Sequence, residues 1–435
     1  MRILLFGDGL GMPELLRHVP PAHVCGLVRA ANRPQYHDAL DQLAASTNLP
    51  LAIQPLPASP DYPHFREWVE TLAPDLIWVN SYSMVVRADI LRIPRLGGIN
   101  IHGALLPQYR GCNPTQWAIL RGEMVTGVTL HEMTPGLDEG AIIDQKRVPL
   151  YFEDTWRSAQ ARIGEATDRL IAENLPSILS GCWQAHPQDE ARAQYHPRRH
   201  PEDGRFQWNQ PVYEIYNLVR ALVAPHPGTF SEDETNGRTV IDSYRTPAAL
   251  AAMKHAHMGE TYLRGGQVRL RPPRREDSEL LCEWIADREQ FIVNAPLPPI
   301  SQEEHGTWTD SLLGHRTDLV SFVIEDITTR RALGTCHLLN INWVHRSAEL
   351  QIRGSGMESQ NHGWWAEAID LLAGFGFDDL NLHRIYVHIL ASDERAIHTY
   401  EECGFICEGA SREAACIYGD YVEVANLGRI GRKHG

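Results

Sequence analysis

The sequence lacks an excess of basic residues, a long apolar run and any close pair of cysteines. It holds 55 Asp and Glu residues against 40 Lys and Arg, a formal net charge of -15. This balance argues against sequence-independent binding of nucleic acid, which needs excess basic side chains to displace counterions. No apolar run approaches the length that crosses a bilayer. The opening MRILLFGDGLG is typical of a first strand and its turn, not of a signal peptide, so we expect a cytoplasmic protein without a membrane partner.

The cysteines are scattered through the chain, and no two of them have the C-x-x-C spacing. Zinc sites and disulfide frameworks depend on such spacings, so we predict no metal and expect reduced, mostly buried thiols. The eight cysteines are Cys25, Cys112, Cys182, Cys282, Cys336, Cys403, Cys407 and Cys416.

At 435 residues the chain is too long for one compact core, and we expect two or three domains. Up to about residue 150, short apolar runs alternate with amphipathic stretches, which predicts a doubly wound, Rossmann-like α/β domain. The predicted strands are 3–6, 24–28, 75–79, 98–101, 125–133 and 140–150, and the predicted helices are 36–45, 65–73 and 155–180. We place this domain at 1–185.

The remainder divides into three parts. Residues 186–247 hold turn signals and a helix over 211–223, typical of a small appended subdomain, and residues 248–266 end in Leu-Arg-Gly-Gly like a linker. Residues 267–435 combine central strands with helices, which predicts a mixed α+β domain. Its predicted strands are 267–273, 321–326, 332–341, 347–353 and 383–390, and its predicted helices are 277–287, 303–313, 363–377 and 395–405.

The stretch GINIHGALLPQYRGCNPTQWAI, residues 98–119, places two polar side chains at the end of a buried strand. Asn100 and His102 are two residues apart, so they lie on the same face of the strand. An imidazole can take a proton from an attacking amine, and a side-chain amide can hold the negative oxygen of an acyl transfer. Asp138, in the Gly-rich TPGLDEGAI, is the candidate carboxylate that orients the imidazole. Each residue alone is more often structural, but the combination predicts catalysis.

These motifs resemble those of the formyltransferases that use 10-formyltetrahydrofolate. The resemblance covers INIHGALLPQYRGCNPTQWAILRGE, GLDEGAIIDQ and RRHPEDGRFQWNQPVYEIYNLVRALVAPHPGTF. It implies that Asn100, His102 and Asp138 form the catalytic set and that 10-formyltetrahydrofolate is the donor. It also implies that the folate lies beside residues 81–90 and 137–141, with contacts from Ser83, Met84, Val85, Val86, Ile90, Leu137, Glu139 and Gly140.

The acceptors of that family include initiator methionyl-tRNA, glycinamide ribonucleotide and nucleotide-linked amino sugars. The Arg198-Arg199-x-Pro-Glu-Asp-Gly motif and the later PHPGTF look most like the sugar and tRNA branches, and the acidic balance favours a nucleotide-linked amino sugar. Arg110, Arg198 and Arg199 are candidate contacts to its phosphates. For the Arg198-Arg199 pair, an ordinary exposed ion-pair site is an equal alternative.

Binding of a dinucleotide is a poorer interpretation of the first domain. GDGLG supplies Gly7, Gly9 and Gly11, but the spacing G-x-G-x-x-G fails. Arg29 also follows the second strand, where an acidic residue would hold a ribose.

The last domain resembles the GCN5-related N-acetyltransferases, over QVRLRPPRREDSELLCEWIADRE, PISQEEHGTWTDSLL, SAELQIR and RAIHTYEECGFICEG. The resemblance implies acetyl-CoA as donor and Tyr400 as the acid that protonates the leaving thiolate. Glu349 is a candidate base, with a cross-strand ion pair as the alternative. Gln360 and Gly363 match the cofactor loop of that family. Trp365 stands where a small residue would let the backbone approach a phosphate, and it could instead serve packing.

We therefore predict a bifunctional N-acyltransferase that formylates a nucleotide-linked amino sugar and acetylates an amino sugar. Two alternatives stay open. The formyl acceptor could be an amino-acid or natural-product amine, and the last domain could be a non-catalytic binding or dimerisation module. A homodimer is one assembly that we consider.

Overall fold

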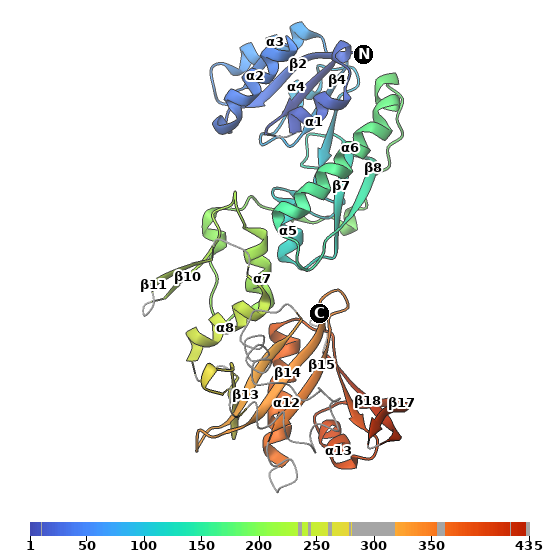
Figure 1. The fold of residues 1–435 in the computed structure, drawn as a ribbon. Coiled ribbons are helices and arrows are strands. Elements are labelled where there is room, and N and C mark those ends of the chain that lie inside the picture. The colour runs from blue at the N-terminus through green and yellow to red at the C-terminus, as the bar shows by residue number, and fades with distance from the viewer. Residues whose placement is uncertain are drawn as a thin grey trace. The chain divides into compact units, whose positions relative to one another are not determined.

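The computed structural model describes residues 1–9, 11–233, 237–241, 245–259, 263–277, 280, 318–354, 362–417 and 419–431. The chain forms two compact units. One consists of residues 1–204 with 220–227, and the other consists of residues 205–219 with 228–435. Each unit contains a seven-stranded sheet (Figure 1).

The sheet of the first unit has the strand order β3-β2-β1-β4-β5-β7-β8. The first five strands run parallel, and β7 and β8 are antiparallel to their neighbours. The strands are β1 (Ile3–Gly7), β2 (Val24–Ala30), β3 (Leu51–Gln54), β4 (Leu76–Asn80), β5 (Gly98–His102), β7 (Val125–Glu132) and β8 (Ile142–Pro149). The α/β prediction is confirmed. Strand β3 was not predicted because it has four residues and only its last one is buried.

Helices cover both faces of this sheet. Ile3 and Leu5 of β1 pack in one core cluster with residues of α1 and α6, whereas Leu4 and Phe6 pack in a second cluster with α3 and α4. Successive side chains of a strand point to opposite faces, so one apolar run contributes to both cores. The helices are α1 (Gly11–His18), α2 (His37–Thr47), α3 (Tyr62–Leu72), α4 (Ala88–Leu91), α5 (Pro114–Leu120) and α6 (Trp156–Ser180).

Two strand pairings position the polar residues near the end of β5. Strands β5 and β7 pair in antiparallel fashion, with Asn100 opposite His131. The short strand β6 (Arg110–Gly111) pairs in parallel with β9 (Tyr195–His196). The second pairing brings the segment around residues 188–196 to the Leu-Leu-Pro-x-Tyr-Arg-Gly turn, although almost 80 residues separate the two in the sequence.

The expected small subdomain contains helix α7 (Val212–Ala221) and the hairpin of β10 (Thr229–Asp233) and β11 (Gly237–Ile241). The next segment, 248–266, was expected to be a linker. More than half of it is helical instead, because α8 spans Pro247–Met258. This helix is rich in Ala, the residue with the highest helix propensity, and the side chain of its N-cap residue accepts a hydrogen bond from the first turn.

The sheet of the second unit has the order β12-β13-β14-β15-β16-β18-β17, in which β15 and β16 form the parallel pair. Its mixture of strands and helices confirms the α+β prediction. The strands are β12 (Val268–Arg271), β13 (Val320–Asp326), β14 (Ala332–Asn342), β15 (Ser347–Gly354), β16 (Arg384–Leu390), β17 (Ile406–Ile417) and β18 (Asp420–Ile430). Among the described residues after 267, the helices are α12 (His362–Gly374), which continues into a π-helical turn at Phe375–Asp379, and α13 (Glu394–Glu402). The helices predicted over 277–287 and 303–313 lie outside the described residues, apart from Asp277 and Leu280.

The parallel pair in this sheet is short. Strands β15 and β16 pair only over Ser347–Glu349 and Arg384–Tyr386, although they continue to Gly354 and Leu390. Beyond Glu349, β15 stays paired with β14 on its other side. The two parallel strands therefore part beyond Glu349 and Tyr386.

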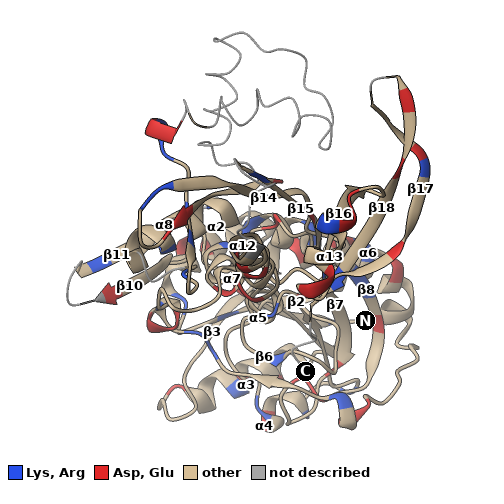
Figure 2. Cartoon of the chain, turned by 90° about the horizontal axis from the view of Figure 1, so that it is seen from below, with Lys and Arg blue, Asp and Glu red and all other residues tan. Residues whose placement is uncertain are grey.

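No helix of the described ranges is long and apolar enough to span a membrane. Basic and acidic residues are interspersed over the elements drawn in Figure 2. The described cysteines are free, but the expectation of mostly buried thiols is wrong, since most of them are exposed or half-buried. Two of the three exposed thiols belong to β17, a strand whose residues are almost all exposed. Exposed are Cys182, Cys407 and Cys416, buried are Cys336 and Cys403, and Cys282 lies outside the described residues.

Candidate active site

The structure brings Asn100, His102 and Asp138 together at the carboxyl end of β5. Asp138 comes from the loop after β7, and its Oδ2 lies 3.6 Å from His102 Nδ1. A fourth side chain, His131 of β7, completes the cluster. Its Nε2 lies 3.7 Å from Asp138 Oδ1 and 3.1 Å from Asn100 Nδ2. An amide, two imidazoles and a carboxylate thus meet at one edge of the sheet.

The sequence interpretation missed His131. The signal was the motif Thr-Leu-His in a predicted strand, but its meaning depends on which residue of β5 it opposes. A strand register follows from the sheet pairing and not from one strand alone. Because His131 stands opposite Asn100, both side chains lie on the same face of the sheet.

The hydrogen bonds of the two histidines fix where their protons lie. His102 Nε2 lies 2.8 Å from the carbonyl oxygen of Tyr109, and a carbonyl can only accept, so Nε2 carries the proton. Its other nitrogen, Nδ1, faces Asp138 and is the atom that can take up a second proton. His131 Nδ1 likewise donates to the carbonyl oxygen of Glu132 at 2.7 Å. His131 Nε2 therefore accepts a hydrogen bond from the Asn100 amide.

Burial lowers the pKa of His131 to about 4, although the nearby Asp138 acts in the opposite direction. His131 is therefore neutral near pH 7 and keeps its lone pair toward Asn100. The contact fixes the orientation of the Asn100 amide, because the amide oxygen would repel that lone pair. One N–H of Asn100 bonds His131, and the other remains to hold a negatively charged oxygen.

The loop that carries Asp138 adopts an unusual backbone conformation. Asp138 has φ of 55°, in the left-handed region that non-glycine residues seldom enter. Its Oδ2 accepts a hydrogen bond from the backbone N–H of Gly111 at 2.9 Å. Gly140 follows, and a Cβ there would lie 1.7 Å from the carbonyl oxygen of Glu132, so only glycine fits.

The residues expected beside the folate divide into surface and core positions. Val85 and Leu137 are exposed, and Met84 is half-buried. Val86 and Ile90 instead belong to a buried core cluster, so their side chains serve packing. The remaining three residues already take part in internal hydrogen bonds: Ser83 with Asp8, Glu139 with Tyr195, and the Gly140 carbonyl with Gln188.

The expectation that Arg110 contacts a substrate phosphate does not fit the structure. Its side chain is fully buried, and all five of its N–H groups are used inside the protein. Two donate to Gln188 Oε1, two to the Glu190 carboxylate and one to the Tyr195 hydroxyl. Motif spacing could not reveal this, because the partners lie at residues 188–195.

Arg198 and Arg199 occupy different surroundings. Arg198 is exposed, and its Nη2 donates to the carbonyl oxygen of Ser83 at 3.3 Å. The Arg199 guanidinium lies 5.1 Å from the ring centre of Trp117 and donates to the carbonyl oxygen of Asp203. Its Nε is buried and has no hydrogen-bond partner, and burial lowers its pKa. Arg199 is therefore the better placed of the three arginines for an anionic ligand.

In the second unit, Tyr400 is buried on α13, and its ring packs edge-on against Phe405. Burial raises the pKa of its hydroxyl, so the hydroxyl keeps its proton at neutral pH. Glu349 on β15 accepts a hydrogen bond from Asn340 at 3.0 Å. Burial, together with the charge of Glu349, raises the pKa of Tyr386. No hydrogen bond between described residues joins Tyr400 to Glu349.

The cofactor loop of the second unit is only partly described. Gln360 lies outside the described residues, and Gly363 is the second residue of α12. A Cβ on Gly354 would lie 2.6 Å from the Trp365 ring, and one on Gly334 would lie 3.0 Å from it. The two glycines are paired neighbours on β14 and β15, so they make room for the indole. This favours the packing interpretation of Trp365.

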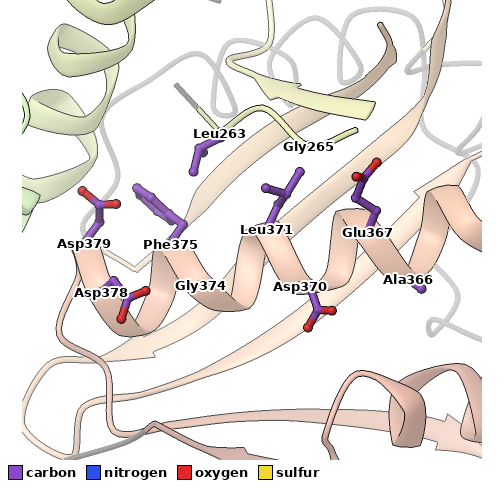
Figure 3. A pocket seen from close by; sticks show the side chains of 10 residues that line it. All are labelled: Leu263, Gly265, Ala366, Glu367, Asp370, Leu371, Gly374, Phe375, Asp378 and Asp379. Atoms are coloured by element: carbon purple, nitrogen blue, oxygen red, sulfur yellow. The ribbon is translucent and has the colours of Figure 1, made fainter. Parts of the chain in front are cut away.

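A pocket of about 550 Å³ in the second unit lies along α12, and none of the predicted site residues lines it (Figure 3). Several carboxylates face it, but they have partners within the protein. Glu367 accepts backbone N–H groups of residues 266–268, Asp370 pairs with Arg429, and Asp379 pairs with Lys254. The pocket is lined by Leu263, Gly265, Ala366, Glu367, Asp370, Leu371, Gly374, Phe375, Asp378 and Asp379.

Three family descriptions match successive parts of the chain. Residues 20–175 match the formyl transferase family, and residues 199–263 match the formyl transferase C-terminal domain. Residues 267–406 match the acetyltransferase (GNAT) domain.

Individual relatives match the same parts. The bifunctional polymyxin resistance protein ArnA of Wigglesworthia glossinidia brevipalpis is 37% identical over 190 residues, which make up 42% of this chain. The chain spans 29% of the length of that relative. A spermidine N-acetyltransferase of Vibrio cholerae, solved with CoA and spermine, is 31% identical with a TM-score of 0.36, covering 38% of this chain and 96% of that one. An N-formyltransferase of Helicobacter canadensis, solved with folinic acid and dTDP-3-aminofucose, is 19% identical with a TM-score of 0.44, covering 55% of this chain and 86% of that one.

Proposed function

Because the chain joins formyl transferase domains to an acetyltransferase (GNAT) domain, we propose that it is a bifunctional N-acyltransferase. Its first part transfers a formyl group from 10-formyltetrahydrofolate to the amine of a nucleotide-linked amino sugar. Its last part transfers an acetyl group from acetyl-CoA to an amino sugar. The observation that carries the first part is the cluster of Asn100, His102 and Asp138 at the end of β5.

The side chains of this cluster fit the chemistry of acyl transfer. The folate donor, when bound, supplies the formyl group. The free N–H of Asn100 stabilises the formyl oxygen as negative charge builds on it. His102 Nδ1 takes the proton that the attacking amine loses and returns it to the departing nitrogen of the donor. Asp138 stabilises the positive charge on His102 between these two steps. One C–N bond forms, one breaks, and no electrons are exchanged with a further reactant.

The nucleotide-linked acceptor is supported by Arg199. A guanidinium beside an aromatic ring, with a buried N–H that has no partner, suits an anionic group next to a flat base. The acidic balance of the chain also disfavours a tRNA acceptor. An amino-acid or natural-product amine is the alternative acceptor, and it would leave Arg199 without a phosphate to bind.

The test is product analysis with the whole chain. The purified protein is incubated with 10-formyltetrahydrofolate and a panel of nucleotide-linked amino sugars, and the products are weighed by mass spectrometry. We expect one acceptor to gain a formyl group, and the Asp138→Asn variant to form far less of this product. If no nucleotide-linked acceptor gains formyl mass while an amino-acid amine does, the alternative replaces the proposal.

The acetyl transfer is supported by two features of the second unit. The parallel strands β15 and β16 pair only as far as Glu349 and Tyr386, and a parted pair of strands gives room for an extended ligand between them. Tyr400 keeps its proton at neutral pH, as an acid for a leaving thiolate must. Calorimetry with acetyl-CoA tests the binding. We expect Tyr400→Phe to lose acetyl transfer and to keep formyl transfer. A complete absence of acetyl-CoA binding would instead support a non-catalytic module.

A further inference from the structure

Arg110 has an internal role, because its side chain is buried and is bonded within the protein. A fully buried arginine whose five N–H groups are all bonded is held rigidly in the protein. The hydrogen bonds to Glu190 raise the pKa of Arg110 and lower that of Glu190. Charge-assisted bonds of this kind, in fork geometry, are among the stronger hydrogen bonds in proteins.

Arg110 reaches the catalytic loop through Gln188. The Gln188 side-chain oxygen accepts two N–H groups of Arg110, at 2.7 and 3.1 Å. Its nitrogen donates to the backbone carbonyls of Asp138 and Gly140, at 2.8 and 2.7 Å. Both N–H groups of the Gln188 amide donate, and its oxygen accepts two hydrogen bonds. A flip that exchanged the nitrogen and the oxygen would break all four bonds.

Further contacts close this connection into a ring. The Tyr195 hydroxyl, which accepts from Arg110, donates to Glu139 at 2.8 Å. The residue after Arg110 is Gly111, whose backbone N–H bonds the Asp138 carboxylate. The carbonyl of Asp138, its carboxylate and the next side chain are thus all tied to the β6 and β9 segments.

The ring offsets a conformational cost. The left-handed region is disfavoured for non-glycine residues, although Asp enters it more readily than most, so contacts that hold Asp138 there favour one loop conformation over the others. Another conformation would move the carboxylate away from His102 Nδ1. Small displacements of a catalytic group can lower the rate about a hundredfold.

We propose that Arg110 and Gln188 are positioning residues, which hold the Asp138 carboxylate against His102 for the formyl transfer proposed above. The inference rests on that proposed function. It assigns to Arg110 no contact with either substrate, so its influence passes through the loop that carries Asp138. The effect of breaking the connection should therefore fall on kcat and leave KM for the acceptor almost unchanged.

The decisive variant is Gln188→Glu. A glutamate keeps the acceptor that Arg110 needs, so the buried guanidinium stays paired, but it lacks the two N–H groups that bond the carbonyls of Asp138 and Gly140. We expect kcat of formyl transfer to fall about 10- to 100-fold, with KM for the acceptor changed less than about twofold.

A double-mutant cycle distinguishes positioning from a general structural effect. In the Asp138→Asn variant, the further change Gln188→Glu should lower kcat only slightly, since the side chain that Gln188 positions has already lost its charge. The matched control is Glu190→Gln, which alters an exposed partner of Arg110 and leaves the bonds from Gln188 to the loop in place. We expect that control to retain kcat within about twofold.

The outcomes separate this inference from the proposed function. If the wild-type chain formylates no acceptor, the proposed function fails. If the wild type is active and Gln188→Glu has the same kcat, the positioning role is wrong. It is equally wrong if the effects of Gln188→Glu and Asp138→Asn simply add.

Discussion

The side-chain nitrogen of Asn100 lies 3.1 Å from His131 Nε2, across the antiparallel pair β5 and β7. His131 donates its other ring N–H to a carbonyl oxygen, so it can only accept from Asn100. A neutral histidine thereby determines which end of the amide is the nitrogen. The amide that would stabilise the oxyanion is thus oriented before any substrate arrives, and this preorganisation is what makes such donors effective.

Replacing Asn100 by Ala should lower kcat of formyl transfer about 10²- to 10³-fold, which is typical for loss of one oxyanion donor. The change also leaves His131 Nε2 without its donor, so we expect a loss of stability of about 1–3 kcal/mol. Steady-state kinetics below the melting temperature check the first effect, and urea denaturation checks the second. Asn426→Ala on β18, in the other unit, is the control and should leave formyl transfer unchanged. Equal kcat for Asn100→Ala and wild type would exclude an oxyanion role.

Buried histidines should make the protein less stable in weak acid. Burial lowers the pKa of His337 to about 3 and that of His131 to about 4, from an ordinary value of 6.5. Between pH 6.5 and the lowered pKa of each histidine, the unfolded chain binds more protons than the folded chain. The free energy of unfolding therefore falls as pH decreases through this range. The stabilisation is complete above about pH 6.5, and the slope reaches about 1.4 kcal/mol per pH unit for each such group.

The variant His337→Gln tests this dependence. His337 bonds the hydroxyl groups of Ser321 and Thr335, and an amide can form similar bonds without titrating. Urea denaturation at several pH values from 7 to about 5 should show a shallower dependence for the variant than for the wild type. Identical slopes would mean that His337 is not neutral and buried in the folded protein.

Most of the fold could be predicted from apolar periodicity, because buried strands and amphipathic helices have direct signatures. Asn100 and His102 could be placed on one face for the same reason. The role of His131 needed the register between β5 and β7, which a sequence does not give. The motif around Arg110 suggested a contact with the substrate. The structure instead shows a buried contact of Arg110 with Gln188, 78 residues away in the sequence, which the motif does not contain.

Two other differences have local causes. Val86 and Ile90 were expected beside the folate, and the structure places both side chains in a buried core cluster. The segment 248–266 was interpreted from its Gly-containing end, whereas the Ala-rich start determines its structure. In both cases, residues outside the short motif determine the structure that the motif adopts.

Arg199 should determine affinity for a nucleotide-linked acceptor. Replacing it with Ala removes the buried Nε–H and the contact with Trp117, so we expect KM for the acceptor to rise about tenfold or more, with a smaller effect on kcat. Arg199→Lys should not restore affinity, because an ammonium group lacks the planar fork. The control is Arg192→Ala, an exposed position on a short turn. If the rise in KM is the same for an acceptor amine without phosphate, Arg199 does not bind the nucleotide.

The ion pair of Lys254 and Asp379 lies within the second unit and is largely buried, with 5% and 15% of the side chains exposed. Lys254 comes from α8, and its ammonium group also donates to the carbonyl oxygen of Gln210 at 2.9 Å. Asp379 comes from the turn after α12. Replacing Lys254 with Met leaves a buried carboxylate unpaired, so we expect a loss of stability of about 3–5 kcal/mol.

The double variant of Lys254→Met and Asp379→Asn separates charge from packing. It removes the unpaired charge, so it should be more stable than Lys254→Met alone, and urea denaturation of both variants measures the difference. Arg412→Met, on the exposed strand β17, should change stability by less than about 0.5 kcal/mol. If Lys254→Met unfolds at the same urea concentration as the wild type, α8 is not anchored at Asp379. Residues 248–266 would then act as the linker that their Gly-containing end suggested.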